Sequence, residues 1–241
     1  MSLTQSDAYT TQPTTVADAS LADRLDFIRD TYLHLGLAIF AFIGVEWFLF
    51  QTGIADAFAN FVFSASISWL LILVLFMVVG SLANRWAHSD ASPLMQYFGL
   101  GVYVVAEAVL FIPLLFIAME YTNSVLVIPS AAVITLSVFG GLTLFVFTSR
   151  KDFSFLRTGL AVASFMALGL IVVAILFGFD LGILFSVVMV GLAAGYVLYT
   201  TSNVLHHYQP GQHVAASLAL FSVIALMFWY VLRILISLNR K

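Results

Sequence analysis

The sequence contains no cysteine and few charged residues. Of its 241 residues, 9% are Asp, Glu, Lys or Arg, whereas 62% are hydrophobic. The absence of cysteine excludes a disulfide framework, a thiolate metal site and a cysteine nucleophile. A soluble domain needs far more charge on its surface, so the composition predicts a protein that is embedded in a lipid bilayer.

Strong net charge and recognisable catalytic motifs are also absent. The formal net charge is -3 and no basic run occurs, so a nucleic-acid partner is not expected. There is no phosphate-binding loop, HExxH motif or nucleophile elbow, so we expect neither an enzyme nor a cofactor. Residues 1–20 lack the features of a secretory signal and are expected to form a disordered polar tail before a membrane domain at 21–241.

Long apolar runs fill the remainder of the chain. A bilayer core requires about 20 consecutive apolar residues per helix, and backbone polar groups in lipid must be bonded within their own segment. The expected fold is therefore an all-α integral membrane protein, a bundle of seven transmembrane helices joined by short links. The expected helices lie near 31–50, 62–83, 95–118, 124–148, 156–178, 181–199 and 213–237.

Two helix starts carry capping residues. Ser20 precedes a stretch whose apolar residues recur at helical spacing, which favours a helix capped by Ser20. This stretch either lies along the membrane surface or extends the first span. Asp180 lies in a tight turn, where we expect it to cap the sixth helix.

The distribution of Lys and Arg predicts the orientation in the membrane. Basic residues occur before the first span and in the links after the second and fourth, but not after the first, third or fifth, which favours a cytoplasmic N-terminus. The residues concerned are Arg24, Arg29, Arg85, Arg150, Lys151 and Arg157. Arg233, Arg240 and Lys241 break this pattern. The last helix is therefore either a full crossing against the charge rule or a re-entrant segment.

Two carboxyl groups at membrane depth are candidate functional residues, because ionisable groups in a bilayer are expensive. Glu107 lies near the middle of the third expected helix, six residues before Pro113, and is a candidate proton or cation site. Its alternative role is a neutral carboxyl that bonds to a neighbouring helix. Glu46 lies nearer the end of the first helix, beside Trp47, and is alternatively an interfacial anchor.

The histidines and one pair of glycines indicate a functional role less clearly than the two carboxyl groups do. His206, His207 and His213 lack the spacing of a metal site, so we expect a solvated loop, with pH sensing as the alternative. Gly191 and Gly195 form a small-xxx-small pattern, which we expect to serve packing within the bundle.

Residues 148–156, TSRKDFSFL, resemble a loop of the Bax inhibitor-1 family, whose bacterial members include the YccA-like proteins. The stretches TYLHLGLAIFAF and ASLALFSVIALMFWYVLRIL resemble the first and last helices of that family, so the resemblance covers nearly the whole chain after about residue 25. It implies a seven-helix bundle with the last helix near its centre. The residues that match the loop motif are Lys151, Asp152, Phe153, Ser154 and Phe155.

The resemblance also bears on function. The family is associated with a pH-sensitive calcium leak, with restraint of cell death in eukaryotes and, in bacteria, with binding of the FtsH-type protease. Its leak is attributed to two aspartates, whose positions are occupied here by Thr200 and Val223. Neither residue can share a proton as paired carboxylates do, so we do not expect that gate. The stretch YTTSN at 199–203 is expected to be a helix end whose hydroxyls bond the last carbonyls.

Two main hypotheses for function follow. The first is a regulatory or scaffold protein that binds other membrane proteins, such as a membrane-bound AAA protease of the FtsH type. The second is a leak channel or transporter for H⁺ or Ca²⁺ that uses Glu107 in place of the missing aspartates. A small-solute permease is a third, weaker alternative, because no internal repeat is evident. The resemblance and the lack of organelle signals favour a bacterial plasma (inner) membrane.

Overall fold

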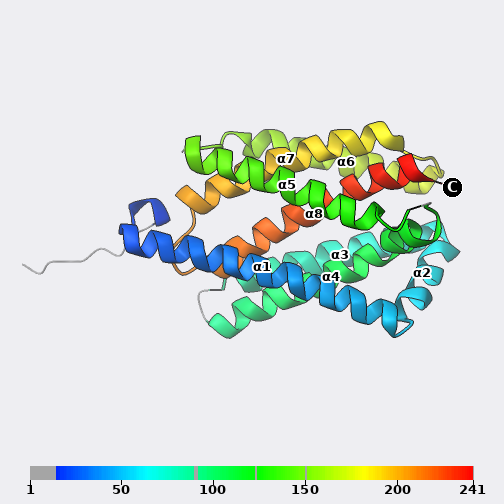
Figure 1. The fold of residues 1–241 in the computed structure, drawn as a ribbon, viewed down its shortest axis with the longest axis horizontal. Coiled ribbons are helices and arrows are strands. Elements are labelled where there is room, and N and C mark those ends of the chain that lie inside the picture. Colours follow the sequence, from blue (N-terminus) through cyan, green and yellow to red (C-terminus); the bar gives the residue numbers. More distant parts are fainter. Residues whose placement is uncertain (1–14, 90–91, 123, 150, 241) are drawn as a thin grey trace, which may run out of the picture.

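The computed structural model describes residues 15–89, 92–122, 124–149 and 151–240. Nearly all of these residues are helical, and the long helices lie side by side in one bundle (Figure 1). A short 3-10 turn, η1, precedes the helices. The elements are η1 (Val16–Asp18), α1 (Leu21–Gln51), α2 (Ile54–Ser64), α3 (Ser66–Ala87), α4 (Pro93–Glu120), α5 (Val127–Ser149), α6 (Leu156–Phe177), α7 (Gly182–His206) and α8 (His213–Asn239).

Seven of these helices are long and apolar enough to cross a membrane, which confirms the expected all-α architecture. Within the described residues there is no sheet, only an isolated bridge between Thr122 and Arg240. The helix α8 is continuous and runs along the bundle, so its two ends lie at opposite ends of the molecule (Figure 1). Its length and composition are sufficient for a full crossing, which favours that alternative over a re-entrant segment. Arg150 and Lys241, which entered the charge pattern, lie outside the described residues.

The start of the chain differs from the expected tail. Residues 1–14 lie outside the described residues, but Val16 is fully buried and its N–H donates to the carbonyl of Tyr208 at 2.8 Å. The last part of the expected tail is therefore packed on the bundle, because its apolar side chain finds a buried site. Ser20 caps α1 by accepting the Asp23 N–H at 3.2 Å. The stretch after Ser20 extends the first span, which was one of the two alternatives.

The helix α2 was not expected as a separate element. The expected second span began at residue 62, but α2 ends at Ser64 and Ala65 is extended, with φ -156° and ψ 144°. The apolar pattern continues through this break, so hydrophobicity alone could not locate it. Gly53, in the left-handed conformation at φ 74°, provides the turn from α1 into α2.

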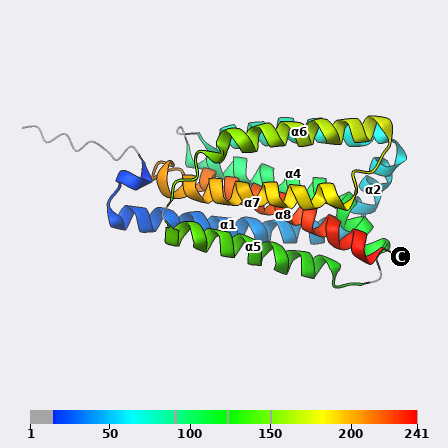
Figure 2. The ribbon, with the colours of Figure 1, turned by 90° about the horizontal axis from the view of Figure 1, so that it is seen from above.

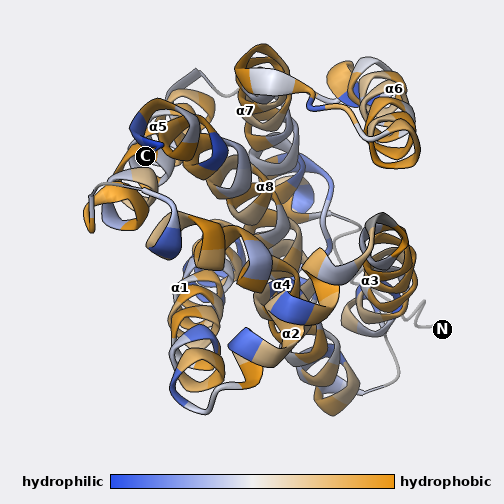
Figure 3. Ribbon diagram, turned by 90° about the vertical axis from the view of Figure 1, so that its right-hand side faces the viewer, coloured by the Kyte–Doolittle hydropathy of each residue, from blue (hydrophilic) through white to orange (hydrophobic). Residues whose placement is uncertain are grey.

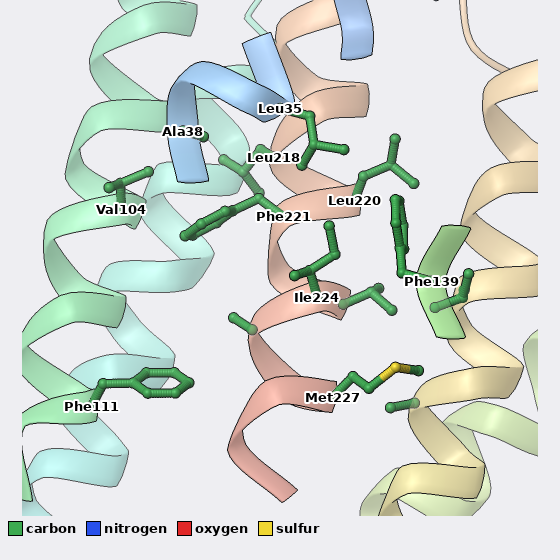
Figure 4. Packing of buried hydrophobic residues seen from close by; sticks show 14 of the residues in the cluster. Leu35, Ala38, Val104, Phe111, Phe139, Leu218, Leu220, Phe221, Ile224 and Met227 are labelled. Atoms are coloured by element: carbon green, nitrogen blue, oxygen red, sulfur yellow. The ribbon is translucent and has the colours of Figure 1, made fainter. Parts of the chain in front are cut away.

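The last helix, α8, lies at the centre of the bundle, as the resemblance implied. It contacts α1, α3, α4, α5 and α7, and these helices surround it in the end-on view (Figure 3). Figure 4 shows Leu220, Phe221 and Ile224 of α8 among side chains from α1, α4 and α5. These three residues are among the buried core. Burial on all sides explains why α8 is apolar around its whole circumference.

The helix α6 stands apart from this centre. It packs against α3 and α7, whereas α8 lies further inside (Figures 2 and 3). Gly195 permits the contact with α7, because a Cβ atom there would lie 2.8 Å from Leu160 Cδ2. The expected packing role therefore holds for Gly195, whereas a Cβ atom on Gly191 would meet nothing within 4 Å. Because α6 is separated from α8, a cavity lies between these helices and is lined by both.

Candidate functional site

Glu107 is presented by α4 together with two aromatic residues. Pro93 is the first residue of α4. An N–H at this position would have no acceptor within the helix, so proline costs no hydrogen bond there. Pro113 lies inside the helix. Tyr103, Glu107 and Phe111 are spaced by four residues and therefore share one face of the helix. All three line the same cavity.

The cavity has a volume of about 800 Å³ and lies among α3, α4, α6, α7 and α8. Most of its wall is apolar and much of it is aromatic. Phe111 forms a T-shaped pair with Trp229 at a centroid distance of 5.1 Å, and Tyr103 lies 6.0 Å from Phe76. Glu107 is 5% exposed, so its carboxyl is buried in protein while bordering an open space.

Polar groups near Glu107 come from two helices. The Tyr103 hydroxyl interacts with the Glu107 carboxyl and with Ser222 on α8. Ser222 Oγ also donates to the carbonyl of Ala219 at 2.8 Å. The hydroxyl neighbour of Glu107 therefore comes from its own helix, α4, and not from a neighbouring helix, as the alternative of a neutral carboxyl expected.

An ion pair between α8 and the link from α6 to α7 lines part of the cavity. Arg233 Nη2 of α8 donates to Asp180 Oδ1 at 3.2 Å, and both residues line the cavity. The same carboxylate oxygen accepts the N–H of Gly182, the first residue of α7, at 3.0 Å. Asp180 was expected to cap this helix, but the N-cap position is Leu181, and Asp180 bonds from the residue before it. A second cavity of about 470 Å³ shares Asp180 and Arg233 and extends to Arg240. The two spaces therefore meet at this ion pair, at the end of the bundle where α8 ends.

Glu46 lies elsewhere. Its side chain is 7% exposed, and neither carboxyl oxygen has a hydrogen-bond partner. It does not line the cavity that holds Glu107. The structure therefore does not bring the two carboxyls into one site, and Glu46 is a buried residue and not an exposed anchor.

The loop motif is fixed to the end of α7. Ser202 Oγ donates to Asp152 Oδ1 at 3.2 Å and accepts the Phe153 N–H at 2.9 Å. The Asp152 carboxylate also accepts the Ser154 N–H at 2.8 Å and lies 3.1 Å from His207 Nε2. The Ser154 N–H is the main cause that lowers the pKa of Asp152 below its ordinary value, and His207 adds to it.

The expected helix end at YTTSN is wrong, because α7 continues to His206. Its serine hydroxyl holds the 151–155 loop and does not cap the helix, whereas Thr201 is fully buried. The three histidines are also not simply solvated. His207 pairs with Asp152, and the ring of His213 lies 5.0 Å from that of His34. Within the described residues, no group of three His, Cys, Asp or Glu side chains could hold a metal ion.

Comparison with known proteins decides the family. The sequence model described as "Inhibitor of apoptosis-promoting Bax1" matches residues 24–240. This chain belongs to the Bax inhibitor-1 family. Protein lifeguard 4 of Mus musculus is 27% identical over 234 residues, covering 94% of this chain and 91% of the relative.

Two further relatives match over similar lengths. The Golgi anti-apoptotic protein of Vaccinia virus (strain Lister) is 26% identical over 235 residues, covering 94% of this chain and 91% of the relative. Bax inhibitor 1 of Schizosaccharomyces pombe is 29% identical over 230 residues, covering 92% and 80% respectively. No solved structure gives a significant match.

The two positions discussed for the Bax inhibitor-1 gate are both buried. Thr200 on α7 and Val223 on α8 are each 6% exposed, and the two helices pack against each other. Val223 lines the cavity with Glu107, whereas Thr200 does not. The cavity therefore borders one of the two positions, and the carboxyl in it comes from α4.

Several residues of the cavity were missed by sequence reasoning. Tyr103 had a signal, because it precedes Glu107 by one helical turn. Ser164 of α6 and Tyr196 of α7 had none, although their hydroxyls lie 2.9 Å apart and both line the cavity. Such pairings between distant helices depend on how the bundle packs.

Proposed function

We propose that this Bax inhibitor-1 protein is a leak pathway for protons or Ca²⁺, with the Glu107 carboxyl as its intramembrane site. The observation that supports the proposal is that Glu107 borders a cavity of about 800 Å³, which extends to the Asp180–Arg233 ion pair. A carboxyl at this depth is expensive unless it binds a proton, a cation or a polar partner. A buried carboxyl that needs such a partner and borders an open space is suited to exchange a proton or bind a cation.

We propose that the route differs from the family's paired-aspartate gate. Thr200 and Val223 offer no carboxylate to share a proton, whereas Glu107 offers one from α4. The Asp180–Arg233 ion pair lines the same cavity and is the next charged group on this route. A single carboxyl titrates without the coupling that separates the pKa values of a close acid pair.

We propose a bacterial inner membrane with a cytoplasmic N-terminus as the setting. The orientation is supported by the excess of Lys and Arg near the start of α1 and in the link around Lys151. The part of the cavity near Asp180 would then lie toward the side of the membrane opposite the cytoplasm. We further propose that the protein is not an enzyme, since its sequence contains none of the catalytic motifs considered above.

The test is flux into liposomes that contain the purified protein. We expect Ca²⁺ or H⁺ flux in the native protein and its loss in Glu107→Gln, at both a mildly acidic and a mildly alkaline pH. Glu46→Gln is the matched control, because it removes a buried carboxyl outside the cavity. Undiminished flux in folded Glu107→Gln would rule out this residue as the site.

Binding of a membrane protease of the FtsH type is the second candidate function. The observation that favours it is the fixed loop at 151–155, which holds Phe155 73% exposed beside the exposed Lys151. An exposed aromatic residue on a rigid loop is typical of a contact surface. Purification in mild detergent should recover the protease with the native chain and less of it with Phe155→Ser. Equal recovery with both chains would exclude this loop as the contact.

A further inference from the structure

The cavity has more room and more aromatic surface than a proton or metal ion requires. Ligand pockets for drug-sized molecules measure about 300–1,000 Å³, and this cavity, at about 800 Å³, lies within that range. Its aromatic walls come from four helices. They include Trp69 and Phe76 of α3, Phe111 of α4, Tyr196 of α7 and Trp229 of α8.

The described lining of the cavity has more acidic than basic side chains. Among the described residues that line it, the Asp, Glu, Lys and Arg side chains are those of Glu107, Asp180 and Arg233. Arg233 is paired with Asp180, so Glu107 is the carboxyl in this lining that has no cationic partner. A cation that entered the deep part of the cavity would meet this carboxyl without competition from another positive group.

Aromatic residues near Glu107 add to the attraction between the cavity and a cation. Tyr103 and Phe111 lie one turn before and one turn after Glu107 on the same face of α4. Trp229 packs edge to face on Phe111, with ring planes at 84°. Aromatic faces attract organic cations by their quadrupole, and the attraction grows where water is excluded.

We propose that the cavity binds a lipophilic organic cation, with its charge at Glu107 and its apolar body against the aromatic walls. This inference goes beyond the leak: it assigns a class of small-molecule ligand to the site. It rests on the cavity, its aromatic lining and its uncompensated carboxyl. An anionic or neutral molecule of the same shape lacks the interaction with Glu107.

Tetraphenylphosphonium and tetraphenylborate test the proposal, because they have nearly the same shape and opposite charge. Binding to the purified protein in nanodiscs is measured by the fluorescence of Trp69 and Trp229, which line the cavity, in a variant with Trp47→Phe and Trp86→Phe. Protein-free nanodiscs correct for partition into lipid. We expect saturable binding of the phosphonium ion at one site per chain and none of the borate ion.

Variants connect this binding to the carboxyl. Glu107→Gln should weaken phosphonium binding by about tenfold or more, as for loss of a charged partner. Glu107→Asp, which keeps the charge, should retain most of the affinity, and Glu46→Gln should bind as the native protein does. Thermal unfolding shows that each variant is folded. Equal binding of both ions, or native affinity in Glu107→Gln, would overturn the proposal and indicate an acyl chain or another apolar occupant.

The same experiments separate this inference from the leak. Both use Glu107, but binding is measured at equilibrium and flux across a gradient. Phosphonium binding that depends on Glu107 without any flux would support the ligand site and contradict the leak. Flux that depends on Glu107, with no selective phosphonium binding, would support the leak and overturn the ligand site.

Discussion

Replacing Gly99 by alanine should destabilise the bundle through the contact between α3 and α4. A Cβ atom at Gly99 would lie 2.6 Å from the Ala83 carbonyl oxygen and 2.7 Å from the Ala87 backbone nitrogen. The shorter distance is about 0.8 Å less than the closest ordinary contact. Both of these neighbours are backbone atoms of α3, so a side-chain rotation cannot relieve the overlap and the helices must move apart.

The size of the effect follows from two opposing terms. Overpacking of this kind costs about 1–3 kcal/mol, whereas alanine gains about 1 kcal/mol over glycine inside a helix. We therefore expect Gly99→Ala to lower the free energy of unfolding by up to about 2 kcal/mol. Gly101 lies on the same helix and provides the control, because a Cβ atom there would meet nothing within 4 Å.

The two variants are compared by reversible unfolding in mixed micelles, followed by helical circular dichroism. Gly101→Ala should be as stable as the native protein or slightly more stable. Because the helix-propensity term is common to both variants, their difference measures the steric term alone, about 1–3 kcal/mol. Equal stability of Gly99→Ala and Gly101→Ala would refute the close packing of α3 on α4.

Three further predictions concern other contacts. Ser202→Ala should speed hydrogen exchange at the Phe153 amide, its bonding partner, without a change in the core; unchanged exchange would contradict the loop contact. The pKa of Asp152 is lower in the folded state than in the unfolded state. Its carboxylate therefore stabilises the loop above the unfolded pKa, and this stabilisation is lost as the pH falls through the folded-state pKa. Hydrogen exchange of the loop amides, corrected for the intrinsic pH dependence, should be less protected in acid. Gly195→Ala should reduce thermal stability less than Gly99→Ala does, since its Cβ would meet the flexible end of Leu160.

The overall fold was predictable because its signals are local. Seven apolar runs, with short links between them, indicate seven helices, and the structure has them. Ser20 was predicted as the cap of α1 because a capping residue acts within its own turn. Asp180 was expected to cap α7, and it bonds the Gly182 N–H from the residue before the N-cap. The break at Ala65 was not predictable, because apolar residues flank it on both sides.

The site was predictable only in part, because its partners are distant in the chain. The cost of a charge in lipid identified Glu107 and Glu46 alike, but only the packing of α4 against α8 determines that Glu107 borders the cavity. Asp180 was expected to cap a helix, and its partner Arg233 lies 53 residues away. The serine at position 202 had a hydroxyl suited to a helix end, yet it holds a loop 50 residues earlier.

The most direct test of the central claim measures access to the cavity beside Glu107. The chain has no cysteine, so single cysteines can be introduced without a background. Ser222→Cys lies in the cavity wall, whereas Ser217→Cys, on the same helix, replaces a fully buried residue outside it. We predict that a cationic methanethiosulfonate reagent, added to the side where Asp180 lies, modifies Ser222→Cys, leaves Ser217→Cys intact and blocks flux. Failure to modify Ser222→Cys in folded protein would contradict an open route to Glu107.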